Sequence, residues 1–123
     1  MEIIYANGKV QKQCTSVKEA SRLFGGNSAL VRSLLARINA IENAETIKDI
    51  IVQSTFRFHA LKNKNGNNLK GYFAIDVKSI KDPWRIILQP LNDQKEPFDP
   101  CNIDEIADVV RIVEVSEVSK HYE

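Results

Sequence analysis

Three short strand-like runs lie in the middle of the chain, over residues 56–61, 72–78 and 84–88. Hydrophobic and polar residues alternate in the first two, whereas the third is apolar throughout except for Arg85. An alternation with a period of two is typical of strands that bury one face. Two segments of turn-forming residues separate the runs, and the first of these segments is rich in asparagine. We therefore predict a three-stranded antiparallel meander, with Arg57 and His59 on the face of the first strand that the core does not use.

Two segments before this meander have apolar residues at helical spacing instead. Ser16 and Glu19 form a capping box at the start of the first helix, which ends at the glycine pair 25–26. The second helix covers about 28–41, and its apolar stripe consists of Leu30, Val31, Leu34, Leu35, Ile38 and Ile41. A further helical turn is expected at 46–51.

Short β-branched runs at 2–6 and 109–115 predict a first and a last strand. The segment 92–104 is rich in proline, asparagine and aspartate, which favours a loop that ends in a helical turn near 104–107. The predicted order of elements is β-α-α-β-β-β-β. This order indicates one α+β domain over residues 1–123, with two N-terminal helices packed on one face of a mostly antiparallel sheet.

The composition is that of a folded globular protein, with 43% hydrophobic and 27% charged residues. There is no apolar run long enough for a membrane span and no signal-peptide pattern, so we expect a cytoplasmic protein without a membrane partner. Cys14 and Cys101 lack the spacing of a zinc site, and we expect two free thiols and no metal or cofactor.

Charge is unevenly distributed although the net charge is only +1. Residues 57–85 contain 7 Lys and Arg against 2 Asp and Glu, whereas residues 86–123 contain 3 against 9. The middle segment therefore favours a polyanionic partner, although solvated strand edges and loops have the same composition.

The chain contains no phosphate loop, no HExxH and no GxSxG, which removes those enzyme classes. What remains is a set of cations and imidazoles around the meander and at the tail: His59, Lys62, Lys64, Lys70, Arg85 and His121. Cleavage of RNA through its 2′-hydroxyl needs only a base, an acid and cations that stabilise the phosphorane. These side chains include all three kinds of group, although a lone histidine is more often structural than catalytic.

Four stretches together resemble one family: FHALK, LKGYFAIDV, PWRIIL and a closing strand that ends in His121 and Tyr122. They resemble the HigB branch of the RelE/ParE toxin superfamily, which includes the plasmid maintenance killer proteins, over essentially the whole chain. The resemblance implies the toxin of a type II toxin–antitoxin system, an endoribonuclease (mRNA interferase) that cuts translated mRNA in the ribosomal A site without a cofactor. It also implies a helix-turn-helix, HigA-like antitoxin as partner, with operator DNA bound only through that antitoxin.

The resemblance also implies roles for individual residues. His59, Lys62, Arg85 and His121 fall at its catalytic positions, and Lys64, Lys70 and Tyr122 at RNA-binding ones. The tail departs from the family pattern, because histidine precedes tyrosine here, so that Lys120, His121 and Tyr122 all remain candidates for the general acid.

Two other classes of function stay open at this point. ParE-like members of the superfamily inhibit DNA gyrase by binding, and a basic meander also suits a non-catalytic module that docks an acidic protein. The presence of both histidines and of Arg85 favours the endoribonuclease over these two alternatives. We expect Arg85 to be exposed, on the face opposite Trp84, and Trp84 to pack in the core.

Overall fold

The structure is a computed structural model that describes residues 1–62 and 69–120. Its centre is a five-stranded mixed sheet with the strand order β1-β5-β4-β3-β2. The strands are β1 (Glu2–Tyr5), β2 (His59–Ala60), β3 (Phe73–Asp76), β4 (Arg85–Leu91) and β5 (Ile112–Ser119). β1 runs parallel to β5, and all other neighbours are antiparallel. The predicted meander is therefore present as β2, β3 and β4.

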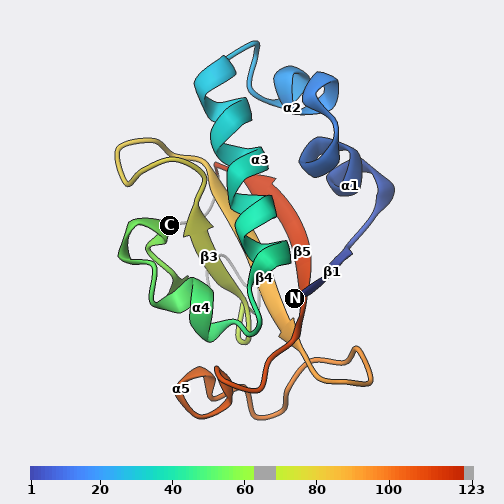
Figure 1. Ribbon diagram of the computed structural model, residues 1–123, viewed down its shortest axis with the longest axis vertical. Coiled ribbons are helices and arrows are strands. Elements are labelled where there is room, and N and C mark those ends of the chain that lie inside the picture. The colour runs from blue at the N-terminus through green and yellow to red at the C-terminus, as the bar shows by residue number, and fades with distance from the viewer. Residues whose placement is uncertain (63–68, 121–123) are drawn as a thin grey trace.

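Helix α3 lies across one face of this sheet, with α1 and α2 beside it (Figure 1). The helices are α1 (Gly8–Thr15), α2 (Val17–Leu23), α3 (Ser28–Asn43), α4 (Lys48–Ile51) and α5 (Ile103–Ile106), with a 3₁₀ turn η1 (Ser54–Phe56). Among the described residues, no helix has the length and apolar character needed to cross a membrane. The α+β class is confirmed, whereas the RelE/ParE assignment remains a prediction.

Side-chain caps explain where the first three helices begin. The side-chain oxygen of Asn7 accepts a hydrogen bond from the Val10 amide at 3.0 Å. Ser16 caps α2 and Asn27 caps α3 in the same way. Each cap satisfies an amide that has no partner inside its helix. The predicted starts of α2 and α3 are thus correct.

The main core fills the layer between the helices and the sheet. Many of its fully buried members come from α3 and from alternate positions of three strands, and they include Leu34, Ile41, Ile75, Ile86 and Val113. A smaller cluster of Leu61, Ala74 and Ile87 lies on the other side of the sheet. We call this second side the distal face, and we define it by His59, Ala74, Asp76, Arg85 and Ile87, which register and alternation place together.

Three predictions about elements were wrong. Helix α1 was not predicted, because only Val10 and Cys14 are buried in it and its other residues are mostly polar. The strand expected at 56–61 is only His59–Ala60, since Phe56 closes a 3₁₀ turn and Arg57 adopts a left-handed conformation with φ 53°. The last strand begins at Ile112 rather than at residue 109 and continues to Ser119.

Candidate functional site

A row of polar residues crosses the distal face at one end of the sheet. Asp76 on β3 is directly opposite Arg85 on β4, and Arg85 is opposite Ser119 on β5. Arg57, two residues before the β2 residue that pairs with Ala74, reaches the same carboxylate from the other side. The neighbouring row contains His59, Ala74, Ile87 and Glu117. Antiparallel pairing thus gathers residues that are far apart in the chain.

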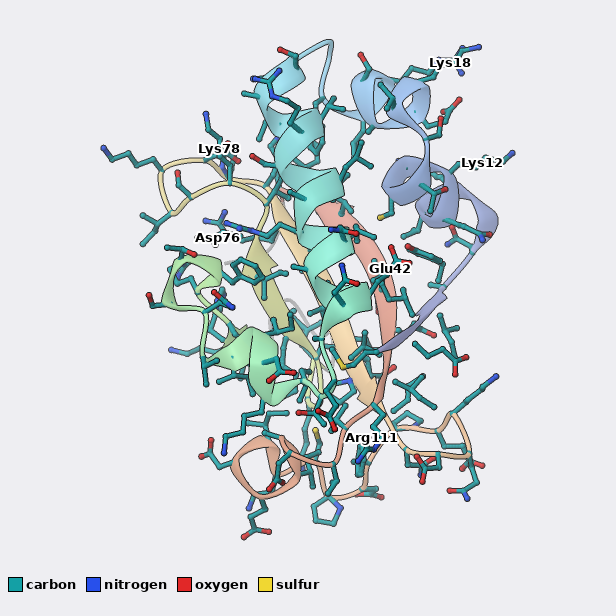
Figure 2. The ribbon with its side chains drawn as sticks, in the orientation of Figure 1. Lys12, Lys18, Glu42, Asp76, Lys78 and Arg111 are labelled. Carbon is teal, nitrogen blue, oxygen red and sulfur yellow. The ribbon has the colours of Figure 1, made fainter. Side chains whose placement is uncertain are left out.

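Asp76 is the centre of this cluster, at the end of β3 beside α3 (Figure 2). Its two carboxylate oxygens accept hydrogen bonds from Nε and from an Nη of Arg57, both at 3.0 Å. The Nε of Arg85 lies 3.2 Å from Oδ1, which is an ion-pair distance without the alignment of a hydrogen bond. Two guanidinium groups therefore share one carboxylate, and the cluster retains one net positive charge.

Arg85 is buried, contrary to the prediction that it is exposed. Only 3% of the residue is accessible. Its Nη1 donates to the backbone carbonyls of Asp82 and Trp84. A buried guanidinium requires a paired anion, and the opposite strand position places Asp76 where it can pair. In this conformation Arg85 holds Asp76 in place and does not present its charge to solvent.

Arg57 is the functional candidate that sequence reasoning missed. Its side chain is 36% accessible, so the donors that Asp76 does not use can reach a ligand. Its positive φ is unusual for a residue with a long side chain, and such conformations gather at functional sites. The sequence feature that points to Arg57 is its position in the run FRFH, two residues before His59 and on the same face of the predicted strand.

The ring of His59 is held in one tautomer. Its Nδ1 lies 2.6 Å from the carbonyl oxygen of Arg57. A carbonyl only accepts hydrogen bonds, so Nδ1 carries the proton, and in the neutral ring Nε2 is then an acceptor. Nε2 is buried and has no partner among the residues that the structure describes. A buried acceptor left unsatisfied is costly, which makes this nitrogen a candidate for chemistry.

The remaining predicted site residues lie apart from this cluster or outside the described residues. Lys62 follows β2, three positions after His59, and is exposed. Lys70 lies in the turn before β3 and lines a hollow of about 250 Å³ with Gln89 and Phe98. Lys64, His121 and Tyr122 lie outside the described residues, so their predicted roles remain predictions.

The distance between His59 and Arg85 follows from the standard spacing of strands in a sheet. His59 and Arg85 are separated by two strand spacings and by two residues along the sheet. With about 4.8 Å between strands and 3.4 Å per residue, their Cα atoms are roughly 12 Å apart. Arg57 is only two residues from His59, and its carbonyl orients the ring. The histidine and Arg57 therefore form the compact, partly accessible part of the site.

Burial changes the acid–base behaviour of Arg37 beside the site and of two cysteines elsewhere in the molecule. The Arg37 side chain on α3 donates to the carbonyl oxygens of Asp76 at 3.0 Å and of Lys78 at 3.3 Å. Burial lowers the pKa of Arg37, and the nearby Asp76 carboxylate opposes this shift. Burial raises the pKa of the Cys14 thiol to about 12, and the pKa of Cys101 shifts in the same direction. Both cysteines are free thiols.

No group of three or more histidine, cysteine, aspartate or glutamate side chains that could hold a metal ion occurs in residues 1–62 and 69–120. The charged side chains at this end of the distal face are instead Arg57, Asp76 and Arg85, and of these only Arg57 is accessible. Such a set suits an anion such as a phosphate better than a cation.

Comparison with known protein families and with curated proteins finds no match for this chain. The arguments for its function therefore come from its own residues and their arrangement.

Proposed function

We propose that this chain is a ribosome-dependent mRNA endonuclease, the toxin of a type II toxin–antitoxin system, with the RelE/ParE-like fold of the HigB branch. The observation that carries the proposal is the state of His59. Its Nδ1 donates to the Arg57 carbonyl, and its buried Nε2 is left as an unpaired acceptor among the described residues, next to a cationic cluster. A base in a fixed tautomer beside cations is what RNA cleavage through the 2′-hydroxyl requires.

The reaction needs no electron transfer and no metal. RNA must first reach Nε2 of His59, which is buried in this conformation. Nε2 then takes the proton of the 2′-hydroxyl, and O2′ attacks the adjacent phosphorus. The bond from phosphorus to O5′ breaks, and O5′ receives a proton from the general acid, for which His121 is the first candidate. The products are a 2′,3′-cyclic phosphate and a 5′-hydroxyl.

Arg57 stabilises the charge that develops on the phosphorane in this scheme. It is accessible, and Asp76 fixes its guanidinium through two hydrogen bonds, so little entropy is lost when it binds phosphate. Exposed Lys62 adds a second cation on the same segment. Arg85 acts indirectly, because its ion pair holds the Asp76 carboxylate in place. Direct contact of Arg85 with phosphate would require this ion pair to break.

The same proposal includes a cytoplasmic setting and a helix-turn-helix antitoxin that neutralises the toxin. The basic segment around the site supports binding to a phosphate backbone but contains few groups that read bases, so the ribosome is needed to present the message. Operator DNA is then bound through the antitoxin.

Two replacements of His59 test the proposal. His59→Asn keeps a donor near the Nδ1 position and loses Nε2, whereas His59→Gln places an amide, which is no base, near the Nε2 position. In a purified translation system, both variants should cut mRNA about 10²- to 10⁴-fold more slowly than the wild type. Thermal unfolding of His59→Asn should remain close to wild type. If the His59→Asn protein is folded and cuts at the wild-type rate, His59 takes no part in the reaction and the proposal is refuted.

A further inference from the structure

A pocket of about 320 Å³ lies where α1, the end of α2 and the end of β5 meet. It exists because β1 pairs with β5 only as far as Val115, after which the chain turns into α1 at Gly8 and β5 continues with β4 as its one partner strand among the described residues. The residues on which the argument depends are Asn7, Lys9, Gln13, Trp84, Glu117 and Lys120. These residues are not part of the cluster around Asp76.

Trp84 lines this pocket and is only partly buried, so the prediction that it packs in the core is correct in part: it packs against the core without being enclosed by it. Phe24 packs against it at a centroid distance of 5.0 Å and an angle of 86°. Lys120 lies over the ring, with Nζ 5.8 Å from the centroid. A stacked ring lies about 3.5–4.0 Å from its neighbour, so Lys120 must move off the Trp84 ring before a planar group can stack there.

The charge around the pocket favours an anion next to that planar group. Lys9 and Lys120 are both exposed and line the pocket together with one carboxylate, Glu117, so the formal charge of the lining is +1. The N-terminus of α1 opens onto it, and the Asn7 cap satisfies the amide of Val10 but not those of Gly8 and Lys9. The first turn of α1 contains no acidic residue. Lys12 and Lys18 project outward from α1 and α2 nearby, which adds positive charge to this end of the molecule (Figure 2).

We propose that this pocket binds one nucleotide of single-stranded RNA. The base stacks on Trp84, and its phosphate meets Lys9, Lys120 and the N-terminus of α1. The volume is at the lower end of the range for small-molecule sites, roughly 300–1,000 Å³, and thus suits a single nucleotide. Stacking on one aromatic ring, with cations at the backbone, is the usual way in which proteins bind single strands.

This inference deepens the proposed function and rests on it for the source of the RNA. Trp84 and Arg85 are adjacent in the chain, at the start of β4, and their side chains leave opposite faces of the sheet. Lys120 follows Ser119, which pairs with Arg85. The pocket and the cleavage site therefore lie at the same end of the sheet. An RNA strand that passes around this end reaches both sites only with nucleotides that are not adjacent, because His59 and Trp84 lie on opposite faces and two strands apart.

Trp84 is the single tryptophan of the chain, so its fluorescence reports directly on stacking. We would titrate adenosine 5′-monophosphate and a hexameric oligoadenylate into the full-length His59→Ala protein, which leaves the RNA uncut. Saturable quenching is expected with both ligands, with tighter binding of the hexamer. Lys9→Ala and Lys120→Ala should each weaken binding roughly five- to tenfold, since each removes one charge-assisted contact. Lys81→Ala, an exposed lysine outside the pocket, should bind as tightly as the parent protein.

Three results overturn the inference: no quenching up to millimolar nucleotide, quenching that is insensitive to Lys9→Ala and Lys120→Ala, or a hexaglutamate peptide that binds as tightly as the RNA. The last result identifies the pocket as a site for an acidic peptide. Ribosome-dependent cleavage by the wild type is measured separately. Quenching without cleavage supports nucleotide binding in the pocket and refutes the proposed function. Cleavage without quenching refutes nucleotide binding in the pocket and leaves the proposed function supported.

Discussion

Replacement of Asp76 by asparagine is the most informative change to the stability of this fold. Asp76 is 1% exposed and Arg85 3%. The asparagine side chain would keep the shape of the aspartate but lose its charge, and its amide would direct N–H groups at one of the two guanidiniums. Arg57 can turn to water because it is half-buried. Arg85 cannot do so, because its surroundings on the distal face are buried.

The size of the effect follows from this difference. Removing one partner of a buried ion pair typically costs about 3–5 kcal/mol, since the other charge stays buried without compensation. The free energy of unfolding of a typical domain is roughly 5–15 kcal/mol, so Asp76→Asn should remove a large fraction of it. The hydrogen bonds from Arg85 to two backbone carbonyls reduce the loss but do not neutralise the charge.

Urea denaturation followed by circular dichroism measures this loss, and Glu19→Gln is the matched control. Glu19 pairs with Arg22 at 3.1 Å, but the Arg22 side chain is 66% exposed. An exposed pair of this kind contributes at most about 1 kcal/mol. If Asp76→Asn costs no more than Glu19→Gln, the cluster does not hold the sheet together, and Arg85 is free to serve the phosphate directly.

Three further changes test other parts of the structure. Arg57→Gly should be more stable than Arg57→Ala by about 1 kcal/mol, because φ is 53° there and both variants lose the same ion pair; equal unfolding midpoints would contradict this. Asn7→Ala should cost about 1 kcal/mol while Asn7→Ser costs little, since the hydroxyl also caps α1; a urea titration decides. Burial raises the pKa of Cys14 to about 12, whereas an unfolded cysteine ionises near a pKa of about 8.5. The unfolded chain therefore releases this proton first, the free energy of unfolding falls as the pH rises through this interval, and Cys14→Ala should make the alkaline loss smaller.

Elements with a strong local signal could be predicted from the sequence. The apolar stripe of α3 and the Asn27 cap act within one segment, so their periodicity and spacing are visible without a fold. Helix α1 has no such stripe. Its stability depends on the packing of Val10 and Cys14 and on the Asn7 cap. In the sequence, the pair Asn7-Gly8 is typical of a turn and therefore hides the start of this helix.

The environment of the site depends on contacts between distant segments, and the sequence shows these poorly. The run containing His59 was recognised as a candidate, but the partner that fixes its tautomer is the carbonyl of Arg57, which no side-chain pattern indicates. Arg85 was predicted to be exposed because it lies on the strand face opposite Trp84. Its burial follows from the register between β3 and β4, which brings Asp76 opposite it.

The most direct test of the proposed function is the chemistry of the RNA ends produced by the wild-type protein. The protein is added to a defined mRNA, either free or on purified ribosomes, and the fragments are mapped and their termini identified. We expect fragments with 5′-hydroxyl and 2′,3′-cyclic phosphate ends only when the mRNA is on ribosomes, and none with His59→Asn. Intact mRNA on ribosomes, together with inhibition of DNA gyrase by the same preparation, would contradict the account and favour a ParE-like mode of action.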